Sequence, residues 1–137
     1  MKKIILGIGL LMSITLVSFK AEKASTYKVD IQKSTLVWTG KKVTGEHKGT
    51  IPLSSGTFSV EDKKIKSGTF EINVAALTVT DITDKDGNAK LVGHLKNDDF
   101  FSTTKFPTAK FVITSVESKG TDNYTINGNL SHSKLDL

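Results

Sequence analysis

Apolar and polar residues alternate along most of the chain, and this alternation predicts short β-strands. The longest run, residues 65–74, places Phe70, Ile72 and Val74 on one side and polar residues on the other, as in a sheet with one dry face. The same period predicts further strands at residues 27–31, 35–42, 47–53, 57–60, 108–116 and 124–130. Six or seven strands at this spacing are typical of an antiparallel sandwich or barrel, so the predicted fold class is all-β.

Turn-forming residues separate the predicted strands. The Ser-Ser-Gly sequence at 54–56 predicts a turn, residues 61–64 a polar hairpin tip, and residues 83–88 a polar loop. Pro52 has no backbone N–H to donate, so it confines its strand to an edge or to a strand end.

The segment from Gly93 to Phe106 departs from the alternation. Leu91 and Leu95 are four residues apart and share one helical face, with His94 beside it. Pro107 ends the segment and favours an extended conformation before it. We therefore expect one helical turn and a loop that lie over one end of the β structure. The aromatic residues of this segment predict a pocket mouth: Phe100, Phe101 and Phe106.

The first residues have the pattern of a secretory signal peptide. Two lysines follow Met1, and an apolar run extends over residues 4–19. The alternative is a membrane anchor, but the run is shorter than the roughly 20 residues that a spanning helix needs. We expect residues 1–21 to be removed, residues 22–137 to form one domain, and the mature protein to be periplasmic or secreted, with no stable membrane span.

Composition narrows the classes of function. Removal of Lys2, Lys3 and Lys20 lowers the formal net charge from +5 to +2, and the chain contains no arginine. Because arginine is the residue that forks onto phosphates and guanines, nucleic-acid binding is not expected. The chain also contains no cysteine, which excludes thiol catalysis and thiolate metal sites.

The titratable residues of the helical segment offer a weaker signal. His94 lies near Asp98 and Asp99, which is compatible with a general base or a metal ligand, but zinc needs at least three convergent ligands and no third has suitable spacing. Residues 84–87 contain two aspartates and a glycine, but their spacing does not match a calcium-binding loop. We therefore predict no metal site, and we expect His94 to be a buried histidine that bonds to the backbone.

The apolar positions on the inner faces of the strands allow two interpretations. Periodicity alone favours an ordinary packed core. A barrel of about eight strands is, however, just wide enough either to fill with side chains or to hold one slim ligand. The inward-facing set is Trp38, Phe58, Phe70, Ile72, Phe111 and Ile113.

Four segments have a distinctive sequence: Val37-Trp-Thr-Gly-Lys-Lys-Val-Thr-Gly-Glu-His-Lys-Gly49, Leu77-Thr-Val-Thr-Asp81, Gly93-His-Leu-Lys-Asn-Asp-Asp-Phe-Phe101 and Lys105-Phe-Pro-Thr-Ala-Lys-Phe111. Together they resemble the YceI family, from Tyr27 to about Leu130. The pairing of the first segment with the third is the specific part of the resemblance.

This resemblance implies an exported, lipocalin-like antiparallel barrel with one short helical insertion. It also implies a binding protein, not an enzyme, that holds a polyisoprenoid or an isoprenoid quinone in an apolar tunnel and needs no other cofactor. The implied ligand-binding residues are Trp38, Phe58, Phe70, Ile72, Leu77, His94, Phe100, Phe101, Phe111 and Ile113. The alternative hypothesis is an envelope hydrolase that uses His94 and Asp98 at the pocket mouth.

The C-terminal sequence departs from the family. Members continue after the Gly-Asn-Leu of residues 128–130 through further strands, whereas this sequence diverges at Ser131. We therefore expect a barrel that lacks its C-terminal strands and does not hold lipid as a monomer. An open sheet edge of this kind favours aggregation or a homodimer. It should also expose four apolar side chains, Phe111, Ile113, Tyr124 and Ile126.

Overall fold

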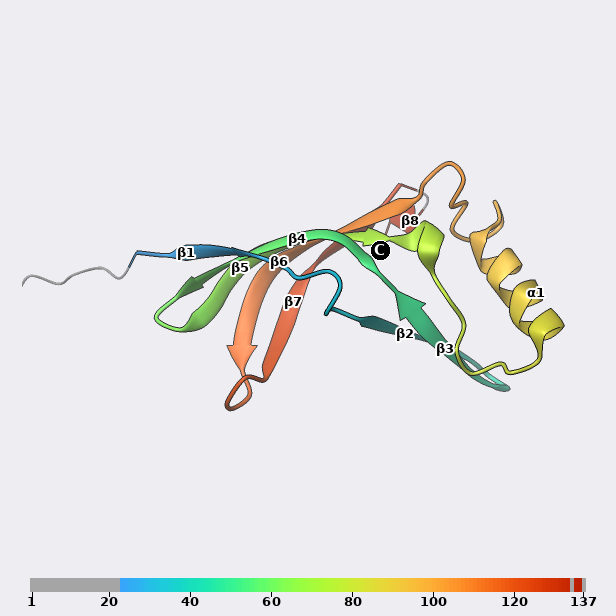
Figure 1. The fold of residues 1–137 in the computed structure, drawn as a ribbon, viewed down its shortest axis with the longest axis horizontal. Coiled ribbons are helices and arrows are strands. Elements are labelled where there is room, and N and C mark those ends of the chain that lie inside the picture. The colour runs from blue at the N-terminus through green and yellow to red at the C-terminus, as the bar shows by residue number, and fades with distance from the viewer. Residues whose placement is uncertain (1–22, 134, 137) are drawn as a thin grey trace, which may run out of the picture.

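The computed structural model describes residues 23–133 and 135–136, which form two antiparallel β-sheets and one α-helix (Figure 1). The elements are β1 (Ser25–Lys28), β2 (Leu36–Lys42), β3 (Gly45–Ile51), β4 (Leu53–Glu61), β5 (Lys64–Asn73), the 3-10 helix η1 (Val74–Ala76), α1 (Lys85–Lys96), β6 (Thr108–Ser118), β7 (Tyr124–His132) and β8 (Leu135–Asp136). The prediction of an all-β antiparallel fold with one helical insertion is confirmed. The predicted signal peptide lies outside the described residues.

The larger sheet has the strand order β1-β4-β5-β6-β7-β8, and β2 pairs only with β3. Within the described residues the two sheets do not close into one barrel. In the same part of the chain, no helix is both long and apolar enough to span a membrane.

Pro52 separates β3 from β4, so one nearly continuous stretch of chain serves both sheets (Figure 1). Proline cannot donate to a strand ladder, which explains the break at this position. Its carbonyl oxygen accepts a hydrogen bond from Asn73 N at 2.9 Å, and this bond ties the corner to the end of β5. The predicted strand end at Pro52 is therefore confirmed.

The predicted turn at residues 54–56 is wrong, because these residues lie within β4. Instead of a turn, the structure has a register shift between Leu53 and Ser55 in the pairing of β4 with β5. Gly56 is needed there for a different reason, since a side chain at this position would collide with Val29 and Phe70. The predicted polar tip at residues 61–64 is confirmed by the turn between β4 and β5.

The helix is longer than the single turn that the sequence predicts, and it replaces most of the expected loop at residues 83–88. Asp84 is the N-cap, and its side chain accepts a hydrogen bond from Gly87 N at 2.8 Å. Such a cap satisfies a backbone N–H that the first helical turn leaves unpaired. Lys85 and Asp86 are exposed in the first turn of α1, whereas the half-buried Asn88 donates from Nδ2 to Val79 O and Ile82 O.

Residues 77–81 fasten the helix connection to the smaller sheet. Thr78 N donates to Thr50 O at 2.8 Å, and Thr80 N donates to Lys48 O at 2.9 Å. The segment therefore runs antiparallel along the edge of β3. It leads from the core directly to α1.

The buried core is small and lies where the two sheets, η1 and α1 meet. Val74, Leu77 and Ala109 form its centre. Partly buried side chains surround them: Ile51, Ile72, Leu95, Phe101 and Leu130. Members of this core cluster line two cavities, Ile51 and Leu77 the smaller one, and Ile72 and Leu130 the larger one.

Candidate ligand-binding site

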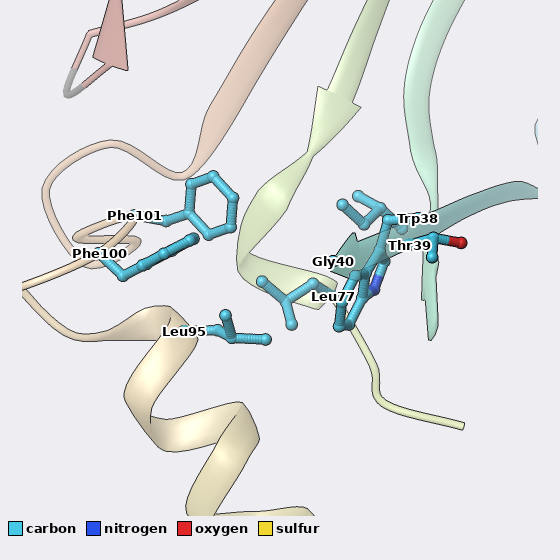
Figure 2. Close-up of a pocket in the computed structure, with 8 residues that line it drawn as sticks. Trp38, Thr39, Gly40, Leu77, Leu95, Phe100 and Phe101 are labelled. Atoms are coloured by element: carbon cyan, nitrogen blue, oxygen red, sulfur yellow. The ribbon is translucent and has the colours of Figure 1, made fainter. Parts of the chain in front are cut away.

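The smaller cavity lies between the β2–β3 hairpin and the helix, and its volume is about 240 Å³. In Figure 2, Leu95, Phe100 and Phe101 lie on one side, Trp38 and Gly40 on the other, and Leu77 between them. The full lining is Trp38, Thr39, Gly40, Ile51, Leu77, Leu95, Phe100 and Phe101. Four of the ten predicted ligand-binding residues therefore lie together here: Trp38, Leu77, Phe100 and Phe101.

The indole ring of Trp38 is held by one long-range hydrogen bond. Its Nε1 donates to Thr78 O at 2.9 Å. Gly49 makes this arrangement possible, because a Cβ on Gly49 would overlap the Thr78 carbonyl group and come within 2.7 Å of the Trp38 Nε1. Glycine is thus required where β3, the indole ring and the 77–81 segment approach one another closely.

A contact between His47 and Asp81 holds the C-terminal end of the 77–81 segment to β3. Asp81 Oδ2 lies 2.9 Å from His47 Nδ1, and Asp81 Oδ1 accepts a hydrogen bond from Lys48 N at 3.0 Å. The hydrogen bond from His47, followed by that from the Lys48 backbone, lowers the pKa of the Asp81 carboxyl group below its usual value. No local pattern pairs these two residues, which are 34 positions apart.

A compact loop holds the phenylalanines at the mouth of the smaller cavity. Phe100 and Phe101 meet edge to face with ring centres 4.6 Å apart. Within the loop, the carboxylate of Asp98 accepts hydrogen bonds from Ser102 Oγ and from Lys105 Nζ. These bonds assign Asp98 a role in the conformation of the loop.

His132 of β7 packs against this loop. It is buried, its ring lies edge-on to Phe101 at 5.8 Å and to Phe106 at 6.1 Å, and its Nε2 lies 3.0 Å from Phe106 O. The contact with Phe101 connects β7 to the lining of the smaller cavity.

The prediction that His94 is the buried histidine is wrong. His94 is exposed on α1, where its ring lies beside Phe100 with ring centres 6.3 Å apart, and it is not part of the lining of either cavity. Leu91, Val92 and Leu95 are among the half-buried residues on the packed side of the helix, and His94 is turned about 100° away from Leu95. The role predicted for His94 belongs to His132.

The larger cavity lies on one face of the six-stranded sheet and has a volume of about 420 Å³. All its lining residues are apolar: Leu36, Leu53, Phe70, Ile72, Phe111, Ile126 and Leu130. Phe70, Ile72 and Phe111 were predicted as ligand-binding residues, and the structure brings them together here.

Glycines beneath the aromatic rings give the larger cavity its depth. Phe70 and Phe111 are cross-strand partners with ring centres 6.4 Å apart. A Cβ on Gly56 would lie 2.9 Å from the Phe70 ring, and a Cβ on Gly128 would lie 2.5 Å from the Phe111 ring. Each ring therefore lies against a position without a side chain and does not stand upright in the cavity.

The two remaining predicted residues, Phe58 and Ile113, line a shallower groove on the same sheet. Tyr27 stacks on Phe58 there, with ring centres 5.7 Å apart. The predicted exposure of Ile113 is wrong, because Ile113 is buried. Gly68 leaves the space that the Ile113 Cδ1 occupies. Phe111 and Tyr124 are half-buried, and Ile126 is 38% exposed.

Several lining residues were missed at the level of sequence. Leu36, Ile126 and Leu130 lie in predicted strands, and the alternation of those strands is enough to predict that their side chains point inward. Ile51 and Leu53 flank Pro52, where the change of sheet interrupts the period, and no local signal marks them. Among the described residues, no three histidine, aspartate or glutamate side chains gather as metal ligands.

Comparison with known proteins supports a family assignment. A family model described as YceI-like domain matches residues 27–133. A UPF0312 protein of Shewanella denitrificans is 41% identical over 76 residues, which are 56% of this chain and 37% of that protein. A UPF0312 protein of Azotobacter vinelandii is 32% identical over 83 residues, 61% of this chain and 41% of that protein. The chain thus spans about two fifths of the length of these curated relatives.

Proposed function

Because this chain belongs to the YceI-like domain family, we propose that it is an exported binding protein for one slender apolar lipid, a polyisoprenoid or an isoprenoid quinone. The observation that carries the proposal is the pair of apolar cavities on either side of one core cluster. The larger volume, about 420 Å³, falls in the range of about 300 to 1,000 Å³ that is typical of small-molecule sites. The proposed location is the periplasm or the cell exterior.

The chemistry of the lining favours a hydrocarbon. Apolar side chains make up the larger cavity, and the indole N–H of the smaller one is already bonded to Thr78 O. Binding would therefore come from removal of apolar surface from water. Each buried methylene contributes about 0.8 kcal/mol, so one five-carbon isoprene unit contributes up to roughly 3 to 4 kcal/mol.

The shape of the site favours a slender ligand over a bulky one. Ile51 and Leu77 line the smaller cavity, Ile72 and Leu130 line the larger one, and all four pack in the core cluster between them. A chain that fills both cavities would have to displace some of these side chains, and a slender flexible chain would displace fewer of them than a wide ring. A wide ring system would have to displace the buried Leu77.

Titration with a length series tests the proposal. Prenols of two to ten isoprene units are added to the protein recovered from the envelope of a bacterial host, and affinity is measured separately for monomeric and dimeric fractions. We expect affinity to rise with length and then to reach a plateau when the cavities are full. Equal affinity for all lengths would show that only the head group binds, and would refute the proposal.

A pair of neighbouring substitutions on β2 provides the matched control. Leu36 lines the larger cavity, whereas Val37 is 69% exposed and points to the other side of the strand. Leu36→Trp should shorten the prenol at which the plateau begins, because the indole occupies part of the cavity. Val37→Trp should leave the plateau unchanged.

The hydrolase hypothesis has no comparable support. His94 lies in solvent beside Phe100, whereas Asp98 is bonded within the loop to Ser102 and Lys105. The two side chains therefore have separate surroundings. We expect no turnover of ester or prenyl-phosphate substrates, and a substrate whose turnover is lost in His94→Ala with the fold intact would restore this alternative.

A further inference from the structure

The β2–β3 tip, residues 41–46, differs from the β4–β5 and β6–β7 tips. Val43 at its apex is fully exposed, with a relative accessibility of 106%, and Lys41 and Lys42 precede it. The β4–β5 tip consists of charged residues of both signs, Glu61, Asp62, Lys63 and Lys64, without an apolar residue. The β6–β7 tip contains Lys119, Gly120, Thr121 and Asp122, also without one.

The geometry of the β2–β3 tip projects it into solvent. Lys42 pairs with Gly45, so Val43 and Thr44 form a two-residue turn. Gly45 has φ of +147°, and a Cβ at this position would meet no atom within 4 Å. The apex therefore has open space around it and can meet a flat surface without rearrangement of the body of the protein.

The hairpin carries a net positive charge on lysines that form no ion pair with the described residues. Lys41, Lys42 and Lys48 are opposed only by Glu46 within the hairpin, and none of the three lysine side chains forms an ion pair with the described residues. The one histidine of the hairpin, His47, is bonded to Asp81. An apolar apex with flanking cations has the chemistry that an anionic membrane surface attracts.

The tip is also continuous with the smaller cavity. Thr39 and Gly40 line that cavity and directly precede Lys41 along β2. Figure 1 shows the hairpin at the same end of the molecule as α1, which supplies Leu95 to the opposite wall. A surface in contact with the tip would therefore lie a few residues from one of the two cavities.

We propose that the β2–β3 tip docks this protein on an anionic phospholipid bilayer, with Val43 in the headgroup layer and Lys41 and Lys42 on the lipid phosphates. This inference rests on the proposed function, because docking places the smaller cavity at the source of an apolar lipid. A single valine and a few lysines give weak, reversible attachment, which suits a carrier that must leave the membrane after exchange.

Flotation with vesicles tests the docking surface. The probe is a vesicle of phosphatidylglycerol and phosphatidylethanolamine, compared with one of phosphatidylcholine alone, and the protein is the form recovered from a bacterial envelope. Each lysine near an anionic surface strengthens binding about fivefold, so Lys41→Gln with Lys42→Gln should weaken binding to the anionic vesicle about twenty-five-fold. Val43→Ser should weaken it about three- to tenfold, and 0.5 M salt should abolish most of it.

The matched control removes two lysines from another hairpin. Lys63→Gln with Lys64→Gln changes the net charge by the same amount on the β4–β5 tip, and it should alter vesicle binding less than twofold. All variants share one N-terminus, so any contribution of that segment cancels. Equal losses in the two double variants, or binding of the wild type to both vesicles alike, would overturn the proposal.

A second measurement separates this inference from the proposed function. Affinity for dispersed farnesol, without vesicles, should be the same in the wild type and in the β2–β3 tip variants, which also shows that the variants fold. A wild type that binds farnesol but no anionic vesicle refutes the docking and leaves the lipid-binding function standing. A wild type that binds the anionic vesicle through the tip but no prenol of any length refutes the lipid-binding function and leaves the docking standing.

Discussion

The two cavities are built in different ways. The larger one takes six of its seven lining residues from β4 to β7, which are joined mainly by neighbouring hairpin pairings. The smaller one brings together β2, β3, the 77–81 segment, α1 and the loop after it. Backbone bonds join the 77–81 segment to β3, and side-chain bonds of Trp38, His47 and His132 connect the other parts. The first depends on a repeating pattern, and the second on a few individual contacts.

This difference determines how each cavity should respond to substitution. At Gly56, beside the larger cavity, an added methyl group would meet only side chains, those of Val29 and Phe70, which can move. The smaller cavity concentrates its geometry at points such as Gly49, where backbone meets backbone. We therefore expect a substitution at Gly49 to have a larger effect than the same substitution at Gly56.

Gly49→Ala should be the most damaging change. Its methyl group would overlap the Thr78 carbonyl group, and neither backbone can move without loss of the Thr78 N–Thr50 O bond. We expect a loss of about 3 kcal/mol in the free energy of unfolding, at the upper end of overpacking effects. Urea unfolding followed by the fluorescence of Trp38 measures it.

Gly93→Ala is the control for this experiment. Gly93 lies within α1, and a Cβ there would meet no atom within 4 Å. The substitution should stabilise the protein by about 1 kcal/mol through helix propensity. Similar effects of the two substitutions would mean that the close approach at Gly49 does not constrain the fold.

Gly56→Ala should have a smaller effect in the larger cavity. The new methyl group would meet Val29 and Phe70, whose side chains can rotate away. We expect a cost of about 1 to 1.5 kcal/mol, no more than half the cost at Gly49. Because the displaced Phe70 ring would enter the larger cavity, the plateau in the prenol series should also begin at a shorter chain. A cost equal to that at Gly49 would remove the proposed distinction between the two cavities.

Asp81→Asn should change the free energy of unfolding least among these substitutions. Its effect should also be the only one that depends strongly on pH. Since the folded-state pKa of Asp81 is lowered, its carboxylate stabilises the fold above the unfolded value of 3.8, and this contribution is lost as the pH falls through the folded pKa. The wild type should therefore be more stable than the variant at pH 7, and the difference should shrink below pH 3.8. Urea midpoints between pH 7 and pH 2.5 give the comparison, and a difference that grows on acidification would contradict the assignment.

The contrast between the cavities also explains which parts of the structure were predictable. The alternation of residues 65–74 and 108–116 gave the strands and the inward side of Phe70, Ile72 and Phe111, because the period of a strand is a local property. The resemblance of the segments around Trp38 and Phe100 brought both residues into the predicted site. Their position in a cavity separate from that of Phe70 depends on the change of sheet at Pro52, which periodicity does not reveal.

The histidines show the limit of local patterns most clearly. His94 lies in an apolar-spaced run, which predicted burial, but α1 packs along its Leu91 and Leu95 side and leaves His94 in solvent. His132 follows the last predicted strand and carried no signal, yet it is buried against Phe101 and Phe106. His47 acquires its role only through Asp81, which the fold brings to it from a distant segment.

The glycines beneath Phe70 and Phe111 constrain how this protein can change over time. A ring and the empty position beside it form one unit that is divided between two strands, Phe70 with Gly56 and Phe111 with Gly128. An enlarged glycine creates a collision, and a shortened phenylalanine creates a hole, so either single step passes through a less stable protein. Gly56 and Phe70, where the collisions are with side chains, should therefore be replaced together across a lineage. Gly128 should persist even where Phe111 is replaced, because a Cβ there would also lie 2.4 Å from Val112 O.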